Sequence, residues 1–288
     1  MKKILAMLAA LGLAGAVALP AQADPQTDLK EFQGYFAKKF PSVKKDEYSN
    51  GFYAFPQFSD YRKMWESYNE FPPYELGLDR GKAFWAKKFA NGQSLQSCVK
   101  KGVIKPAYSY PHWDKARKEL RTAELDINAC LKANGEKEFT NLDKDTKQRV
   151  ALAEVTAYFY SMYKGKRAKP DVDFKDPGAL AAYEKGKEFY WARRGQLNFS
   201  CAACHVQLAG KNMGGNQPLS AGLGHPLGWP AQRLEWGRIE TIMERYATCN
   251  KQVRAKPLKH YGPEYMDLQL YETYMSSGLP LTAPSMRN

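Results

Sequence analysis

The sequence predicts a mainly α-helical protein in which two related halves follow one another. The stretch at 81–98, GKAFWAKKFANGQSLQSC, is echoed at 186–201 by GKEFYWARRGQLNFSC. Both open on Gly-Lys, continue with the aromatic and basic residues of an amphipathic helix, and end on Ser-Cys. A second pair, AYFYSMYKG at 157–165 and YETYMSSG at 271–278, places aromatic residues at helical spacing near the end of each half. Because strand signals are few and weak, the pattern favours a tandem helical repeat.

The first 23 residues are typical of a secretory signal peptide. Lys2 and Lys3 precede a short apolar run, and the Ala-Gln-Ala site at 21–23 predicts cleavage after Ala23. The run is too short and too interrupted to be a membrane span, and no later stretch is apolar enough for one. We therefore expect an exported protein, most simply a periplasmic one, in a compartment where disulfides persist.

Four segments follow the signal peptide. Residues 24–75, rich in aromatic residues and prolines, are expected to form an N-terminal arm that wraps the first half, 76–163. Residues 164–180 are a predicted linker, because KGKRAKPDVDFKDPG combines two prolines, two glycines and dense charge. The second half is 181–288.

The chain is strongly basic, with a formal net charge of +13. Export argues against a nucleic-acid partner, so the charge favours an acidic protein partner or a small anionic substrate. A generally basic, solvated surface would give the same net charge. Charge alone does not separate these interpretations.

The second half contains the pattern Cys-Ala-Ala-Cys-His, formed by Cys201, Cys204 and His205. This spacing is typical of covalent c-type haem attachment: one helical turn presents two thiols to the haem vinyl groups, and the histidine follows as the proximal iron ligand. A redox dithiol or half of a zinc site would use the same Cys-x-x-Cys pair. The zinc site would need a second ligand pair, and the dithiol a βαβ context, and the sequence offers neither.

Each half thus has the plan of a cytochrome c domain, but the first half is degenerate. Val-Lys-Lys-Gly follows Cys98 where the second half has Ala-Ala-Cys-His, so the first half lacks a haem cysteine and the proximal histidine. We expect a single covalent haem c in the protein. Cys130 is the remaining cysteine of the first half, and a Cys98–Cys130 disulfide would stabilise the fold by about 3–4 kcal/mol. The alternative is a pair of free buried thiols.

The sixth iron ligand must come from downstream of His205. Composition alone favours a methionine or a histidine over a cysteine, because electron-transfer cytochromes use those residues. The candidates are Met213, His225, Met243, Cys249, His260 and Met266.

Three observations raise Cys249 among these candidates. It has no obvious partner, in a compartment that usually pairs or eliminates thiols. It ends the helical pattern RIETIMERYATC, so Arg245 lies one turn before it and Arg238 two turns before that. A nearby guanidinium favours the thiolate, the form that binds iron. In the repeat, Cys130 occupies the place that matches Cys249.

The chain resembles SoxA, the c-type cytochrome subunit of the sulfur-oxidising SoxAX complex, an L-cysteine S-thiosulfotransferase. The resemblance spans nearly the whole mature chain and is most specific in RRGQLNFSCAACH, GWPAQRLEW, ERYATC and LQLYETYMSSGLPLTAPSMR. It implies two cytochrome c-like domains in tandem and, because Cys-Val-Lys-Lys-Gly cannot attach haem, the one-haem type. It also implies that Cys249 ligates the iron, typically as a persulfide, and that Arg245 lies in the active site.

The reaction implied by this resemblance joins thiosulfate to a cysteine of the carrier protein SoxYZ. Two electrons leave through haem to a SoxX cytochrome subunit, the partner in a heterodimer. Arg245 offers a fork for the sulfonate oxygens, with a surface arginine or a haem-propionate partner as the alternatives, and Arg238 and Arg254 are weaker candidates. The competing hypothesis is a monohaem electron carrier without sulfur chemistry, which would have methionine or histidine as the sixth ligand.

Overall fold

The computed structural model describes residues 24–287, so the predicted signal peptide lies outside the described residues. Helices dominate this part of the chain, and no helix within it is long and apolar enough to cross a bilayer. The α-helices are α1 (Pro25–Lys39), α2 (Ser59–Tyr68), α3 (Glu75–Ala86), α4 (Leu95–Lys100), α5 (Ala123–Ala133), α6 (Thr146–Ser161), α7 (Pro177–Trp191), α8 (Ile242–Gln252) and α9 (Pro263–Met275). The π-helical segment is η4 (Ala203–Gln207), and the 3-10 segments are η1 (Lys45–Ala54), η2 (Pro56–Phe58), η3 (Ala107–Ser109), η5 (His225–Gly228) and η6 (Leu234–Trp236).

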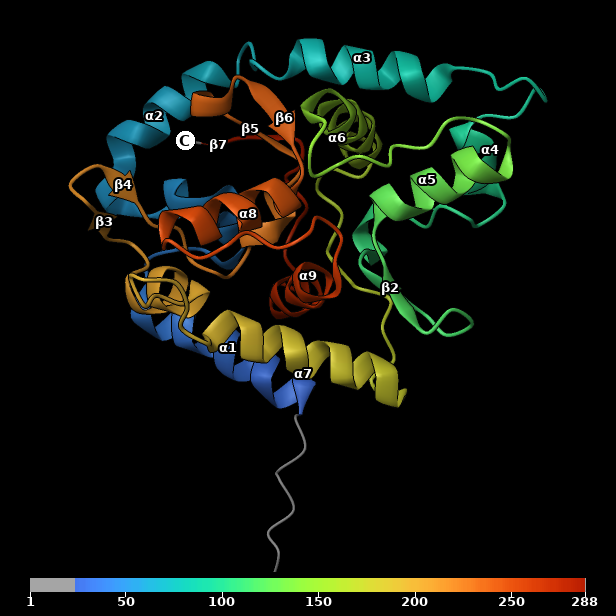
Figure 1. Cartoon of the computed structure of the whole chain (residues 1–288). Helices are drawn as coiled ribbons and strands as arrows, with labels where there is room; N and C mark the ends of the chain where they lie inside the picture. Colours follow the sequence, from blue (N-terminus) through green and yellow to red (C-terminus); the bar gives the residue numbers. More distant parts are fainter. Residues whose placement is uncertain (1–23, 288) are drawn as a thin grey trace, which may run out of the picture.

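The strands are short and belong mostly to hairpins. In the one mixed sheet of the described chain, β5 pairs antiparallel with β6, Ala231 opposite Glu240, and parallel with β7, Ala231 opposite Ser285. This sheet leads directly into α8, which Figure 1 shows in orange at the centre of the molecule. The strands are β1 (His112–Asp114), β2 (Glu119–Arg121), β3 (Asn212–Met213), β4 (Gln217–Pro218), β5 (Ala231–Arg233), β6 (Arg238–Glu240) and β7 (Ser285–Arg287).

The two halves repeat the same helix crossing. In the first half α3 packs on α6, and in the second half α7 packs on α9. A glycine makes each crossing possible: a Cβ on Gly81 would come within 2.1 Å of the Glu154 carbonyl oxygen, and one on Gly186 within 2.0 Å of the Asp267 carbonyl oxygen. Backbones this close exclude any side chain at either glycine. One hydrophobic core, dominated by aromatic residues, runs through both halves.

The N-terminal arm covers the second half, so the expectation that it wraps the first half is wrong. Figure 1 shows α1, in blue, lying beside α7. Phe32 of α1 packs edge-on against Tyr190 and Tyr271, and Asp28 accepts hydrogen bonds from Tyr183 and Lys187. The aromatic residues of the arm therefore complete the core between α7 and α9.

The segment between the halves is shorter than the predicted linker and is tied down. Helix α7 already begins at Pro177, with Asp176 accepting hydrogen bonds from the Gly178 and Ala179 amides. Before it, the Ala168 amide donates to the Leu279 carbonyl and the Lys169 amide to the Tyr108 carbonyl. The segment thus bonds to both halves and joins them as part of the fold.

Candidate active site

A cavity of about 710 Å³ opens in the second half and collects the chemistry-bearing residues. Cys201 and Cys204 line it from the segment after α7, and His205 follows within η4. Arg245 and Cys249 line it from α8. The sequence-predicted haem, iron and substrate residues therefore meet at one site, and none of its three cysteines forms a disulfide.

His205 is held in the form that binds a metal. Its Nδ1 lies 3.1 Å from the Ser220 carbonyl oxygen, which accepts only, so Nδ1 carries the proton and Nε2 keeps its lone pair. Burial lowers the pKa of His205 to about 3, helped by nearby His225, so the ring is neutral. A neutral imidazole oriented by a carbonyl is the usual state of an iron-binding histidine.

The residues present fit haem c. Two thiols and an oriented histidine stand at the attachment spacing on one wall. The cavity is within the usual size range of cofactor pockets, about 300–1,000 Å³. Burial raises the pKa of the Cys201 and Cys204 thiols, so both are protonated until they react.

The structure sorts the candidates for the sixth ligand. Met213, His225 and Cys249 line the cavity, whereas the other three, Met243, His260 and Met266, do not. The rings of His225 and His205 stack at 4.6 Å with an interplanar angle of 22°. Axial ligands bind from opposite faces of a haem, so a ring stacked on the proximal histidine is poorly placed for the opposite face. Cys249 and Met213 remain.

Arg245 lies on the same helix as Cys249, one turn earlier. Its Nη1 is buried and has no hydrogen-bond partner in the described chain. A buried guanidinium N–H without an acceptor is costly, and an anion in the cavity would satisfy it. The side chain is therefore suited to an anionic ligand beside Cys249.

Sequence reasoning missed three further arginines of the cavity wall: Arg194, Arg233 and Arg287. Arg287 is partly buried and donates to the Ser49 carbonyl at 2.7 Å, and burial lowers its pKa to about 10. Arg233 pairs with Glu235 at 2.6 Å, and burial likewise lowers its pKa to about 10. All three arginines belong to sequence segments that carry the family resemblance. That resemblance was the one signal in the sequence that could have identified them.

The two weaker candidates lie elsewhere. Arg238 forms an ion pair with Glu240 at 2.7 Å, and neither it nor Arg254 lines the cavity. In the first half, Cys98 and Cys130 form a disulfide with Cα atoms 6.1 Å apart. Its two cysteines thus pair with each other, whereas Cys201 and Cys249 of the second half face a cavity.

Known proteins resemble this chain over most of its length. The family model of the SoxA/TsdA cytochrome c domain matches residues 80–165. The L-cysteine S-thiosulfotransferase subunit SoxA of Chlorobaculum thiosulfatiphilum is 43% identical over 92% of this chain and 89% of its own length. The subunit of the same name from Allochromatium vinosum is 42% identical over 98% of both chains.

The fold is also that of a solved relative. The crystal structure of SoxXA from P. pantotrophus matches with a TM-score of 0.64 and 27% sequence identity, over 75% of this chain and 79% of that chain. The cytochrome c family model and the names of the relatives make haem c the cofactor of this family. By sequence identity, coverage and fold, the chain belongs to the SoxA family of L-cysteine S-thiosulfotransferase subunits.

Proposed function

We propose that this chain is the haem-bearing subunit of a periplasmic L-cysteine S-thiosulfotransferase, which couples thiosulfate to a cysteine of a SoxYZ carrier protein. The observation that carries the proposal is the pairing of Cys249 with Arg245, whose buried Nη1 has no partner in the described chain, in the cavity of the Cys-x-x-Cys-His motif.

One haem c is assigned to the chain, attached at Cys201 and Cys204. His205 and Cys249 would hold its iron, and Met213 is the remaining cavity-lining alternative to Cys249. When bound, the haem would supply a one-electron acceptor. The first half holds no second haem, because Cys98 is joined to Cys130 and no histidine follows it.

The proposed reaction forms one sulfur–sulfur bond. The sulfane sulfur of thiosulfate, S₂O₃²⁻, joins the carrier thiol, R–SH, to give R–S–S–SO₃⁻, one proton and two electrons. Arg245 holds the sulfonate oxygens by charge-assisted hydrogen bonds and so aims the sulfane sulfur at Cys249. Cys249 presents a sulfur atom, as thiolate or persulfide, at which the two sulfur groups meet.

The partners follow from the relatives. The solved relative is a SoxXA complex, which supports a SoxX-type cytochrome as the second subunit and as the exit for the electrons. The basic chain, with a net charge of +13, suits an acidic carrier and an anionic substrate. The N-terminal signal pattern, with predicted cleavage after Ala23, supports a periplasmic location.

The test compares Cys249→Ser with Met213→Leu in the holoprotein. Cys249→Ser should keep the covalent haem, because the attachment residues are intact, but change the ferric absorption spectrum and reduce thiosulfate–carrier coupling to background. Met213→Leu should change neither. Intact mass counts the haem in both variants. An unchanged spectrum and full coupling in Cys249→Ser, with a changed spectrum in Met213→Leu, would replace the proposal with a methionine-ligated electron carrier.

A further inference from the structure

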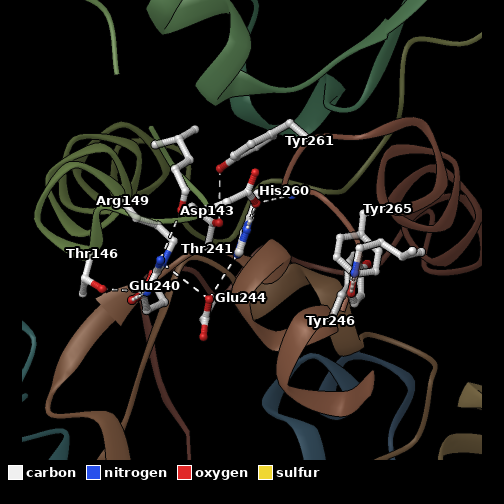
Figure 2. Close-up of polar contacts among 12 residues, drawn as sticks. Asp143, Thr146, Arg149, Glu240, Thr241, Glu244, Tyr246, His260, Tyr261 and Tyr265 are labelled. Atoms are coloured by element: carbon white, nitrogen blue, oxygen red, sulfur yellow. Dashed lines mark hydrogen bonds and ion pairs between the residues drawn. The ribbon is translucent and has the colours of Figure 1, made fainter. Parts of the chain in front are cut away.

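A polar network, buried at Arg149 and Glu240 and exposed at Asp143, joins the haemless half to the start of α8, the helix that carries Arg245 and Cys249 (Figure 2). The first half contributes Arg149 of α6 and Asp143 just before it. The second half contributes three residues that surround the first turn of α8: Glu240, Glu244 and His260. The proposed chemistry uses none of these five residues.

Arg149 fixes the strand that leads into α8. Its Nε donates to Glu240 Oε2 at 2.9 Å and its Nη2 to Oε1 of the same carboxylate at 3.2 Å. The Glu240 side chain is fully buried and that of Arg149 is 7% exposed, so the pair is a desolvated, two-point contact between the halves. Nε also lies 3.4 Å from Glu244 Oε2. Burial alone would lower the pKa of Arg149, but Glu240 outweighs it and keeps the guanidinium charged.

His260 makes the second link between the halves. Its Nδ1 lies 2.7 Å from Asp143 Oδ1 and its Nε2 lies 3.1 Å from Glu244 Oε2. The His260 amide donates to the same Asp143 oxygen at 2.9 Å. Hydrogen bonds hold the pKa of both carboxyls below the ordinary range despite burial, so both are acceptors and both ring nitrogens must donate. His260 is therefore an imidazolium bridge from Asp143 to α8.

The two links act on the same point of the helix. Glu240 precedes α8 by two residues and Glu244 lies in its first turn, next to Arg245. A helix that is held at its first turn and at the strand residue just before it cannot rotate about its axis or slide along it without breaking one contact. The far end of α8 is fixed separately by Asn250, which donates to Tyr265 at 2.8 Å. The direction of Arg245 and the depth of Cys249 in the cavity thus depend on groups of the other half.

We propose that the haemless half serves as an orienting clamp for α8, with Asp143, Arg149 and His260 as positioning residues for Arg245 and Cys249. The inference rests on the proposed function, since it assigns a role to those two side chains. It gives the half without a cofactor a role in the reaction, which is to hold Arg245 and Cys249 in a fixed position relative to the cavity.

The experiment uses the full-length holoprotein with Asp143→Asn, which keeps the shape of the side chain, and His260→Gln, which keeps a polar side chain; both remove the charged bridge. Each should lower coupling kcat/KM by roughly tenfold, mainly through the KM for thiosulfate, and shift the ferric spectrum that reports Cys249 ligation. Covalent haem and far-UV circular dichroism should stay at the wild-type level. Arg149→Met should have a larger effect of the same kind, and its failure to fold would leave the two milder variants as the test.

Two controls isolate the clamp. Asp46→Asn removes an exposed ion pair with Arg167. Arg80→Met removes the ion pair between Arg80 of α3 and Glu154 of α6. Neither ion pair involves α8. Both should keep wild-type coupling and spectrum. In an Arg245→Ala background, His260→Gln should no longer change the KM for thiosulfate, because the two act through the same contact.

Unchanged spectra and coupling in both Asp143→Asn and His260→Gln, or equal losses in the controls, would overturn the clamp. Failure of the proposed function would look different. Wild-type protein would then show no coupling at all, while the spectral shift in His260→Gln would still report on the clamp.

Discussion

The two halves place corresponding cysteines in opposite settings. Cys98 and Cys130 of the first half are joined in a disulfide, whereas Cys201 and Cys249 of the second half form no disulfide and line a cavity. The helix frame around them is the same, down to the glycine at each crossing. A covalent cross-link thus occupies the place in one half that a cofactor site occupies in the other.

The residue one turn before the second cysteine extends the comparison. In the first half it is Asp126, which accepts hydrogen bonds from Tyr110 at 2.8 Å and Arg121 at 2.9 Å. In the second half it is Arg245, whose Nη1 has no partner in the described chain. The polar side chain of the first half is thus hydrogen-bonded to protein groups, whereas Nη1 of the corresponding arginine in the second half is left for a ligand. The two halves therefore share the arrangement of their helices, whereas the candidate active site is found in the second half alone.

The largest effect on stability is expected from the disulfide. Replacing Cys98 and Cys130 together with alanine should lower the free energy of unfolding by about 3–4 kcal/mol, because the bridge closes a loop with a sequence separation of 32. Urea unfolding of the holoprotein measures this loss. The haem spectrum should be unchanged in the folded variant. Loss of the haem spectrum at zero urea would show that the haem site of the second half depends on the disulfide of the first half.

The second largest effect is expected from Arg245. Arg245→Ala should keep the haem but lower kcat/KM for thiosulfate by about 10–100-fold, since one charge-assisted contact contributes about 1.5–3 kcal/mol. The matched variant Asp126→Ala should instead lower the unfolding free energy and leave the KM for thiosulfate unchanged. Steady-state coupling assays and melting curves of both variants decide the point, and a raised KM in Asp126→Ala would break the comparison.

The shared frame predicts equal penalties at the two glycines. Gly81→Ala and Gly186→Ala should each destabilise the fold by about 1–3 kcal/mol, because the new methyl group meets a backbone carbonyl that cannot move aside. Gly34 of α1 has open space around its Cβ position, so Gly34→Ala should stabilise the fold by about 0.4–1 kcal/mol. Thermal melts of the three variants provide the measurement, and a neutral result at one crossing glycine alone would contradict a common frame.

The smallest effect concerns pH. Burial lowers the pKa of His260, but hydrogen bonds to Glu244 and Asp143 outweigh it, so the folded-state pKa is raised. The charged bridge therefore contributes its full stability below the ordinary histidine pKa of about 6.5, and this contribution is lost as pH rises through the raised value. Unfolding free energies measured across this window should fall with pH in the wild type. His260→Gln should remove that component, and an identical slope in the variant would exclude it.

The sequence predicted local chemistry better than it predicted contacts between distant segments. The Cys-x-x-Cys-His spacing, the repeat and the cysteine pairing of the first half depend on residues close in the chain or equal in both halves. The arm was assigned to the wrong half because aromatic residues show that a helix is buried and do not show its partner. Phe32 finds Tyr271 only through the fold.

The cavity arginines illustrate the same limit. Arg233 and Arg287 reach one cavity because β5 and β7 are parallel neighbours, with Arg233 opposite Arg287. No local pattern relates two positions so far apart in sequence. The choice of Cys249 over His225 as the candidate iron ligand likewise depended on the stacking of the His225 ring on His205. That stacking is a property of the folded chain.

The arm on the second half also constrains how the chain reaches its folded state. Gln33 donates to the carbonyl of Met275, 242 positions away, and Lys39 donates to the carbonyl of Val206, 167 positions away. Contacts of such separation form late, because loop-closure entropy opposes them until nearer contacts exist. The first half, whose disulfide joins residues 32 positions apart and whose Arg80–Glu154 contact joins residues 74 positions apart, can fold early. The aromatic face of the arm then stays uncovered until α7 and α9 have formed.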